Sequence, residues 1–235
     1  MLSPSERKKN NFGRSLLPSF SSEMKKYEEI YQLYINEGYI KELCEIYADT
    51  FINDNKKPIP EDIIQVAKLY DRIHDSKSAA FYLDMLSDKK LSGDDRYYYC
   101  IEMLKTKSKL GHWRDADDFR TENINFIQNY SQKKTLQQQA DLYMALALVD
   151  CSAKRYNDAF KLMKFGYKPQ GKNDTKLLEI MITGVYLLQQ SGDQEGLEAA
   201  VASAQACLKL FSEFEFSWSR AYYQKCIDEA AEGII

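Results

Sequence analysis

Apolar side chains recur along most of the chain at intervals of three and four residues, which is the period of an amphipathic α-helix. Short breaks that contain glycine, proline or charged residues separate these runs, so the pattern predicts helices joined by tight turns. We expect helices over about 21–38, 39–53, 61–73, 76–86, 94–110, 136–153, 156–166, 174–190, 194–211 and 213–231, and one more that ends near 130. Pro60 fits the first turn of its helix, where a missing N–H costs nothing.

The stretch Leu110–Phe119 predicts how two of these helices are joined. It places a glycine at the turn, Trp113 two residues later and Ala116 three residues beyond that. We expect Trp113 to fill the seam between two antiparallel helices and Ala116 to let them approach closely. Looser copies of the turn lie at intervals of 36, 37, 43 and 38 residues, anchored on Gly38, His74, Gly111, Lys154 and Gly192. Five positions after each anchor stands a small or apolar residue: Leu43, Ala79, Ala116, Ala159 and Leu197.

A near-constant interval of this size is typical of stacked helix pairs. The segments Gly111-His112-Trp113-Arg114-Asp115-Ala116 and Lys154-Arg155-Tyr156-Asn157-Asp158-Ala159 resemble the hinge of the tetratricopeptide repeat family. The resemblance covers about residues 21–211, although the intervals exceed the family's length of about 34 residues and the proline at the unit end is mostly missing. It implies an all-α, right-handed α-solenoid of about five antiparallel helix pairs with a C-terminal capping helix, in one domain over 21–235. An irregular all-helical bundle is the alternative.

The two ends of the chain differ from the repeats. Residues 1–20 are rich in basic side chains and too poor in apolar ones for a helical stripe, which predicts a mobile basic arm. The alternative is a docking or targeting segment anchored by Leu16, Leu17 and Phe20. The last predicted helix is aromatic and is expected either to cap the last pair or to mediate self-association, through Phe216, Trp218, Tyr222 and Tyr223.

Composition and charge limit the classes of partner. The net charge of the 235 residues is −3, which gives no general attraction to nucleic acid or to an anionic membrane. No apolar run reaches the roughly 18 residues of a membrane span, and charged residues stand where a signal peptide would need its apolar region. The five cysteines are odd in number and widely spaced, as expected for reduced thiols. We therefore expect a cytoplasmic protein that binds neither nucleic acid nor membrane.

Motifs for catalysis are nearly absent from the sequence. The only histidines, His74 and His112, lie at predicted hinges without a cysteine or carboxylate at metal-ligand spacing. Glycine-rich phosphate cradles and nucleophile turns do not occur. The acidic groups are interpreted as charges in the first turns of helices, where the helix dipole favours them: Asp94, Asp95, Asp115, Asp117 and Asp118. We expect no enzyme, no cofactor and no metal.

Binding is the better functional expectation, because the first helices of stacked pairs form a continuous concave wall. The side chains expected to project from this wall are Gln32, Asn36, Lys68, Arg72, Tyr98, Lys105, Met144, Leu148 and Tyr186. Some tetratricopeptide proteins hold the terminal carboxylate of a peptide with Lys and Asn at such positions, so the resemblance implies this role for Asn36, Lys68 and Lys105. Alternatively, the lysines only solvate their helices, and Met144, Leu148 and Tyr186 pack against neighbouring helices.

These observations favour a non-enzymatic interaction module whose concave face binds a peptide or another protein. Two further hypotheses are a structural subunit that assembles through its C-terminal helix and a regulatory array that changes curvature when a ligand binds.

Overall fold

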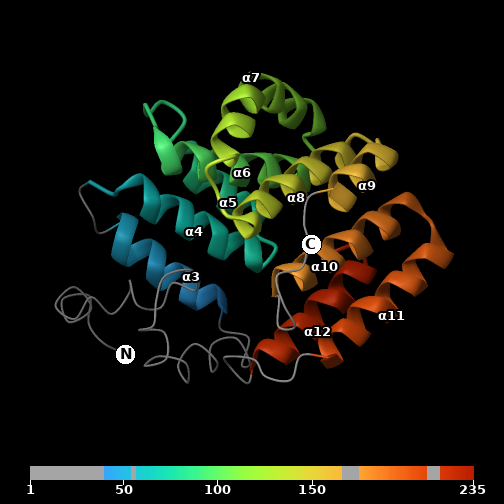
Figure 1. The fold of residues 1–235 in the computed structure, drawn as a ribbon. Coiled ribbons are helices and arrows are strands. Elements are labelled where there is room, and N and C mark those ends of the chain that lie inside the picture. Colours follow the sequence, from blue (N-terminus) through green and yellow to red (C-terminus); the bar gives the residue numbers. More distant parts are fainter. Residues whose placement is uncertain (1–39, 54–56, 166–174, 211–217) are drawn as a thin grey trace. The chain divides into compact units, whose positions relative to one another are not determined.

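The computed structural model describes residues 40–53, 57–165, 175–210 and 218–235, and Figure 1 shows its helices. Within these ranges every regular element is a helix, so the all-α prediction is confirmed there. In chain order the elements are α3 (Ile40–Ala48), the π-helical turn η3 (Asp49–Asn53), α4 (Pro60–Arg72), α5 (Ser76–Asp84), α6 (Gly93–Lys109), α7 (Trp113–Ser131), α8 (Leu136–Ser152), α9 (Tyr156–Phe165), α10 (Thr175–Ser191), α11 (Gln194–Leu210) and α12 (Trp218–Ala231). The predicted arm over 1–20, the helix over 21–38 and the hinge at Gly38 lie outside the described residues.

Residues 1–95 and 96–235 form two compact units, and the division falls in the first turn of α6. In the first unit, α4 contacts α3 and forms a hairpin with α5. Pro60 is the first residue of α4, as predicted. The repeat positions of α4 are all buried: Ile63, Val66, Ala67 and Tyr70. The period read from the sequence therefore gives the inward face of this helix correctly.

Asp75 is the N-cap of α5. Its carboxylate accepts hydrogen bonds from the backbone N–H of Ser78 at 3.0 Å and from the Ser78 hydroxyl at 2.7 Å. Burial by itself would raise the pKa of Asp75, but the hydrogen bonds from Ser78, together with Lys41, hold that pKa below its usual range. The charged carboxylate thus satisfies a helix N–H that has no partner within the helix.

The hinges share one backbone geometry. The torsion φ is positive at every described anchor: 58° at His74, 75° at Gly111, 60° at Lys154 and 77° at Gly192. This left-handed conformation is costly for residues with a Cβ atom, so a histidine and a lysine adopt it only because the helix pairing requires it. In three hinges the next N–H bonds to the carbonyl five residues earlier, a common helix-ending motif. These bonds join Asp75 to Tyr70, His112 to Lys107 and Arg155 to Asp150, at 3.0, 3.0 and 2.7 Å.

The second helix of each hairpin begins in the same way. The N–H five positions after the anchor bonds to the carbonyl one position after it, at 2.9–3.1 Å in all four described hinges. The side chains at this fifth position are all buried: Ala79, Ala116, Ala159 and Leu197. The register predicted from the sequence is therefore confirmed at four consecutive hinges. A similar left-handed turn at Gly233, with φ of 84°, follows α12 and was not predicted.

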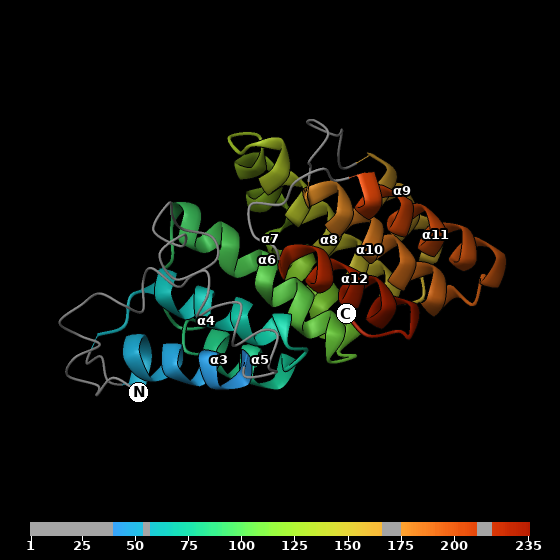
Figure 2. The same cartoon turned by 90° about the horizontal axis from the view of Figure 1, so that it is seen from below.

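In the second unit, three hairpins follow one another: α6 with α7, α8 with α9, and α10 with α11. The first hairpin and α8 share one apolar cluster, in which Cys100, Leu104, Ala116 and Leu142 are buried. The helix α10 contacts α8 and α9 of the preceding hairpin. Figure 2 shows α12 beside α10, and α12 contacts both α10 and α11. Ile227 of α12 is fully buried in their cluster, so the prediction that the last helix covers the last pair is confirmed.

The prediction that Trp113 fills the seam is wrong. Trp113 is the first residue of α7 and is 40% exposed, and the guanidinium carbon of Arg114 lies 5.1 Å from its ring centroid. The seam is occupied one turn later by Ala116, which is fully buried, and by the partly buried Phe119. A residue at the first position of a helix lies at the edge of the contact, where solvent still reaches it.

All five cysteines are free thiols, and Cys44, Cys100 and Cys151 are buried. Burial raises the pKa of Cys44 to about 12 and those of Cys100 and Cys151 to about 11. The free thiols agree with the prediction that the cysteines are not paired in disulfides, and Cys207 and Cys226 are half-buried. Among the helices described, none combines the length and the apolar character that crossing a bilayer requires.

Candidate binding surface of the second unit

The residues predicted for the binding wall divide between the two units. Gln32 and Asn36 lie outside the described residues. Lys68 and Arg72 lie one turn apart on α4 of the first unit, where Lys68 is half-buried and Arg72 is exposed. The other predicted residues belong to the second unit: Tyr98, Lys105, Met144, Leu148 and Tyr186. The structure therefore brings Lys68 and Arg72 together on α4, and it distributes the other five residues over α6, α8 and α10 of the second unit.

Tyr98 connects two successive first helices. Its hydroxyl on α6 accepts a hydrogen bond from Nε2 of Gln138 at 2.6 Å, and the hydroxyl of Tyr97 donates to the backbone carbonyl of Gln138 at 3.2 Å. Oε1 of the same Gln138 accepts from the backbone N–H of Thr135, which completes the capping box at the start of α8. Both ends of the Gln138 amide are therefore used, and they fix the first turn of α8 against α6.

Lys105 lies two turns after Tyr98 on the same helix. Its Nζ is 3.2 Å from Oε1 of Glu102, a residue that is only 4% exposed. A buried carboxylate needs a compensating charge, and Lys105 supplies it. Lys105 therefore has a structural partner in addition to any role toward a ligand.

A charged contact joins the next two first helices. Nζ of Lys176 on α10 lies 2.8 Å from Oδ1 of Asp141 on α8 and also contacts the carboxylate of Glu179. Burial alone would lower the pKa of Lys176, but the carboxylates of Glu179 and Asp141 raise it above its usual range. Because Asp141 follows Gln138 by one turn, half-buried polar side chains run from α6 across α8 to α10.

The three apolar residues predicted for the wall lie mostly in packing contacts. Met144 is 7% exposed and Leu148 is 5% exposed, and the hydroxyl of Thr183 lies 3.5 Å from the Met144 sulfur. Tyr186 is half-buried between two apolar clusters, and burial raises its pKa to about 12. Met144 and Leu148 thus follow the packing alternative and do not form an exposed apolar patch.

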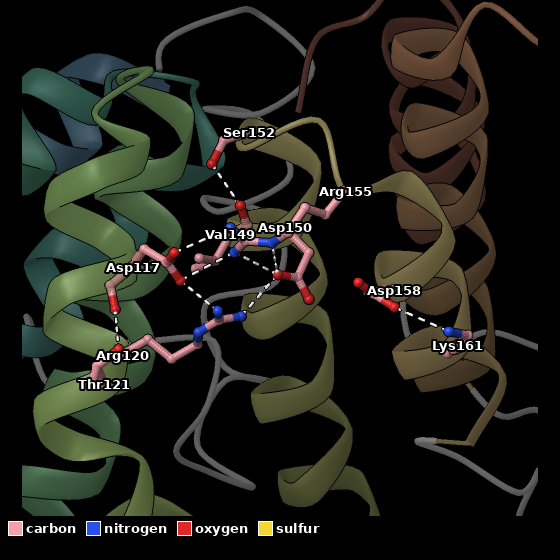
Figure 3. Close-up of polar contacts among 9 residues, drawn as sticks. All are labelled: Asp117, Arg120, Thr121, Val149, Asp150, Ser152, Arg155, Asp158 and Lys161. Atoms are coloured by element: carbon pink, nitrogen blue, oxygen red, sulfur yellow. Dashed lines mark hydrogen bonds and ion pairs between the residues drawn. The ribbon is translucent and has the colours of Figure 1, made fainter.

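Four charged residues link α7, α8 and the following hinge (Figure 3). The buried Asp150 receives the N–H groups of two arginines on one oxygen: Oδ1 lies 2.8 Å from Nη1 of Arg120, and 2.8 and 2.7 Å from Nε and Nη2 of Arg155. Arg155 also forms a bidentate pair with Asp117, with both distances 3.1 Å, and Arg120 contacts Asp117 as well. Burial would lower the pKa of Arg155, but Asp117 and Asp150 raise it.

This network was missed by the sequence analysis. Asp117 was interpreted as a charge at the start of a helix, whereas it pairs with an arginine 38 residues later. Asp150 occupies the repeat position that holds Tyr70 in the earlier hairpin, and it is buried because the two guanidinium groups neutralise it. The sequence did contain a signal for this network, because Asp150 lies on an otherwise apolar helix face and Arg155, which can neutralise it, follows just past the hinge.

An open groove of about 360 Å³ adjoins this network between the second helices α7 and α9, with α8 at its base. Its lining is mostly apolar with a charged rim, and consists of Arg120, Ile124, Gln128, Leu146, Asp150, Asp158, Lys161 and Leu162. Asp158 and Lys161 pair with each other at 3.0 Å. Within the described residues, no hydrogen bond reaches the second oxygen of Asp150, which Figure 3 shows turned away from both guanidinium groups. The groove lies on second helices, whereas the sequence predicted a surface on first helices.

The described residues contain no group of three His, Cys, Asp or Glu side chains that is arranged to hold a metal ion. His74 and His112 are exposed at their hinges. No family model matches the chain, and neither a curated protein nor a solved structure shows significant similarity to it. The tetratricopeptide resemblance therefore rests on the residues alone.

Proposed function

We propose that this protein is a non-enzymatic interaction module, a tetratricopeptide-like right-handed solenoid that binds a segment of another protein along its first helices. The single observation that carries the proposal is the hinge: four consecutive copies share a left-handed anchor and a buried side chain five positions later. Helix pairs joined by equivalent turns pack in equivalent ways, which is the basis of solenoid surfaces. The buried free thiols support a cytoplasmic location.

The first helices of the second unit provide the surface. Tyr98, Asp141 and Lys176 belong to three successive first helices. Tyr98 on α6 is hydrogen-bonded to Gln138 on α8, and Asp141, one turn after Gln138, contacts Lys176 on α10. Their side chains are half-buried, so they are held in place and still reach solvent. Ordered polar groups next to aromatic rings suit recognition of a peptide, because little side-chain entropy is lost on binding.

A library of synthetic peptides with random C-terminal hexapeptides tests this proposal. Each peptide is attached through its N-terminus and presented with either a free or an amidated carboxyl end. If Lys105 binds the terminal carboxylate, Lys105→Gln weakens selected peptides by about tenfold, the effect of one charge-assisted contact. Glutamine offers an N–H donor toward Glu102 but removes the compensating charge, so the stability of this variant is measured together with its binding.

Lys164→Gln is the matched control, because Lys164 is exposed on the second helix α9 and the substitution removes the same charge. Melting temperatures establish that both variants fold. Recovery of no peptide above background would contradict the module, and equal binding of free and amidated ends would contradict the role of Lys105.

A further inference from the structure

Three tyrosine rings of the second unit converge on one cation. Nζ of Lys134 lies 5.5, 5.2 and 5.1 Å from the ring centroids of Tyr97, Tyr98 and Tyr130. Tyr97 and Tyr98 come from α6, Tyr130 comes from the end of α7, and Lys134 lies in the turn before α8. The Tyr97 ring makes angles of 73° with Tyr98 and 42° with Tyr130, so the rings face the ammonium from different directions. We name Tyr97, Tyr98 and Tyr130 the tyrosine cage.

The spacing of the cage fits a methylated ammonium group. A cation over an aromatic face is attracted at distances up to about 6 Å from the centroid. A methyl group between the nitrogen and the ring adds a C–N bond of about 1.5 Å to a carbon contact of about 3.5–4 Å, which gives roughly 5–5.5 Å in total. The three observed distances lie in this range. The nitrogen of an alkylammonium ion at the Lys134 position would therefore lie, for all three rings, at the distance that a methyl group between nitrogen and ring requires.

The rings are held in place by contacts that do not involve the cation. Tyr97 and Tyr98 are both hydrogen-bonded to Gln138, and Tyr130 stacks on Phe126 at 5.5 Å between centroids. Lys134 instead reaches the rings through a flexible side chain from a turn. The cage is thus preorganised around the position of the Lys134 ammonium.

We propose that the tyrosine cage is a binding site for an alkylammonium group, with the Lys134 ammonium as a competing occupant in the unliganded protein. The ligand class is a dimethyl- or trimethylammonium cation, carried either by a methylated lysine of a partner protein or by a small choline-like molecule. The first source rests on the interaction function proposed above, because it needs a bound protein segment. The cage itself does not depend on that function.

The test titrates the full chain with choline and, in parallel, with 3,3-dimethyl-1-butanol, in which carbon replaces the charged nitrogen. Binding is followed by NMR of the tyrosine rings at constant ionic strength. Choline is expected to shift the ring signals of the cage in a saturable way, and the neutral isostere is expected to leave them unchanged. Equal responses to both compounds, or no saturable response to choline in either the natural chain or Lys134→Met, overturn the proposal.

Two sets of variants sharpen the result. Lys134→Met removes the internal competitor and tightens choline binding by about tenfold if Lys134 occupies the cage nine-tenths of the time. Tyr98→Phe keeps the ring but loses the hydrogen bond to Gln138, so it is expected to retain more binding than Tyr98→Leu, which removes the ring and weakens binding by about fivefold or more. If Tyr98→Leu fails to fold, the Lys134→Met comparison still decides, because unchanged affinity in that variant contradicts competition by Lys134.

A peptide library with a central trimethyllysine, compared with the same library carrying lysine, separates the two sources. Selective enrichment of trimethyllysine peptides identifies a protein ligand. Choline binding without such enrichment identifies a small cation and leaves the cage established while the interaction module fails. Recovery of C-terminal peptides without any choline response supports the interaction module and overturns the cage.

Discussion

Replacing the hinge glycines by alanine tests the backbone geometry directly. A methyl group added at Gly111 or Gly192 would meet no described neighbour within 4 Å, so no clash contributes to the cost. The left-handed conformation costs an alanine about 1–2 kcal/mol. Alanine also reduces the conformational entropy of the unfolded chain, which offsets about 0.4–1 kcal/mol of this cost. We therefore expect Gly111→Ala and Gly192→Ala each to lower the free energy of unfolding by up to about 1.6 kcal/mol, with about 0.8 kcal/mol at the centre of this range.

The matched control is Gly184→Ala in the interior of α10, where an added methyl also meets no described neighbour within 4 Å. Glycine is unfavourable inside a helix, so this substitution is expected to raise the free energy of unfolding by about 0.5–1 kcal/mol. Conversely, Lys154→Gly relieves a left-handed lysine and is expected to stabilise the hinge or leave it unchanged. The substitution of glycine by alanine is thus expected to lower the free energy of unfolding at the two hinges and to raise it inside α10.

Urea unfolding followed by circular dichroism at 222 nm measures these effects as shifts of the midpoint at constant slope. In thermal unfolding, 1 kcal/mol corresponds to about 2–4 °C for a chain of this size. The hinge geometry would be refuted if Gly111→Ala and Gly184→Ala changed stability in the same direction.

Three further predictions concern packing, pH and reactivity. Ala116→Leu is expected to overpack the seam and destabilise the protein by about 1–3 kcal/mol, whereas Ala202→Leu, at an exposed site on α11, leaves the melting temperature nearly unchanged. Asp75→Ala is expected to lower the free energy of unfolding by about 1 kcal/mol at pH 7. Because folding lowers the pKa of Asp75, this loss of stability is present above the usual pKa of about 4 and disappears as the pH falls through the pKa of the folded protein. Urea titrations of both proteins at several pH values measure it. Burial raises the pKa of Cys100 and Cys151 to about 11, so both thiols should react slowly with iodoacetamide at pH 8. Mass spectrometry is expected to find them unmodified in the native protein and modified in urea. Fast labelling of the native protein would contradict their burial.

The helices and hinges could be predicted from the sequence because their signals are local. The α-helical period gave α4, α8 and α10 to within one or two residues, and the hinge register placed Ala116 and Ala159 in buried positions. Both features depend on residues only a few positions apart, which share one helix face or one turn.

The remaining features depend on contacts between distant residues. The pairing of Asp117 with Arg155 joins two helices, and neither residue identifies the other in the sequence. The burial of Met144 and Leu148 depends on how α10 packs on α8, and the helical period of α8 alone does not predict that packing. The groove beside α9 likewise results from the spacing of whole helices.

The buried Asp150 has a consequence for the order of the hairpins along the chain. Apolar faces are largely interchangeable, and a hairpin with only leucine and alanine at its contacts would stack on many neighbours. Asp150 is stable inside only if the preceding hairpin supplies Arg120 and Asp117 and the following hinge supplies Arg155. These four charged residues therefore determine that the second of these hairpins follows the first. A chimera that exchanges or duplicates the hairpins must carry all four residues together.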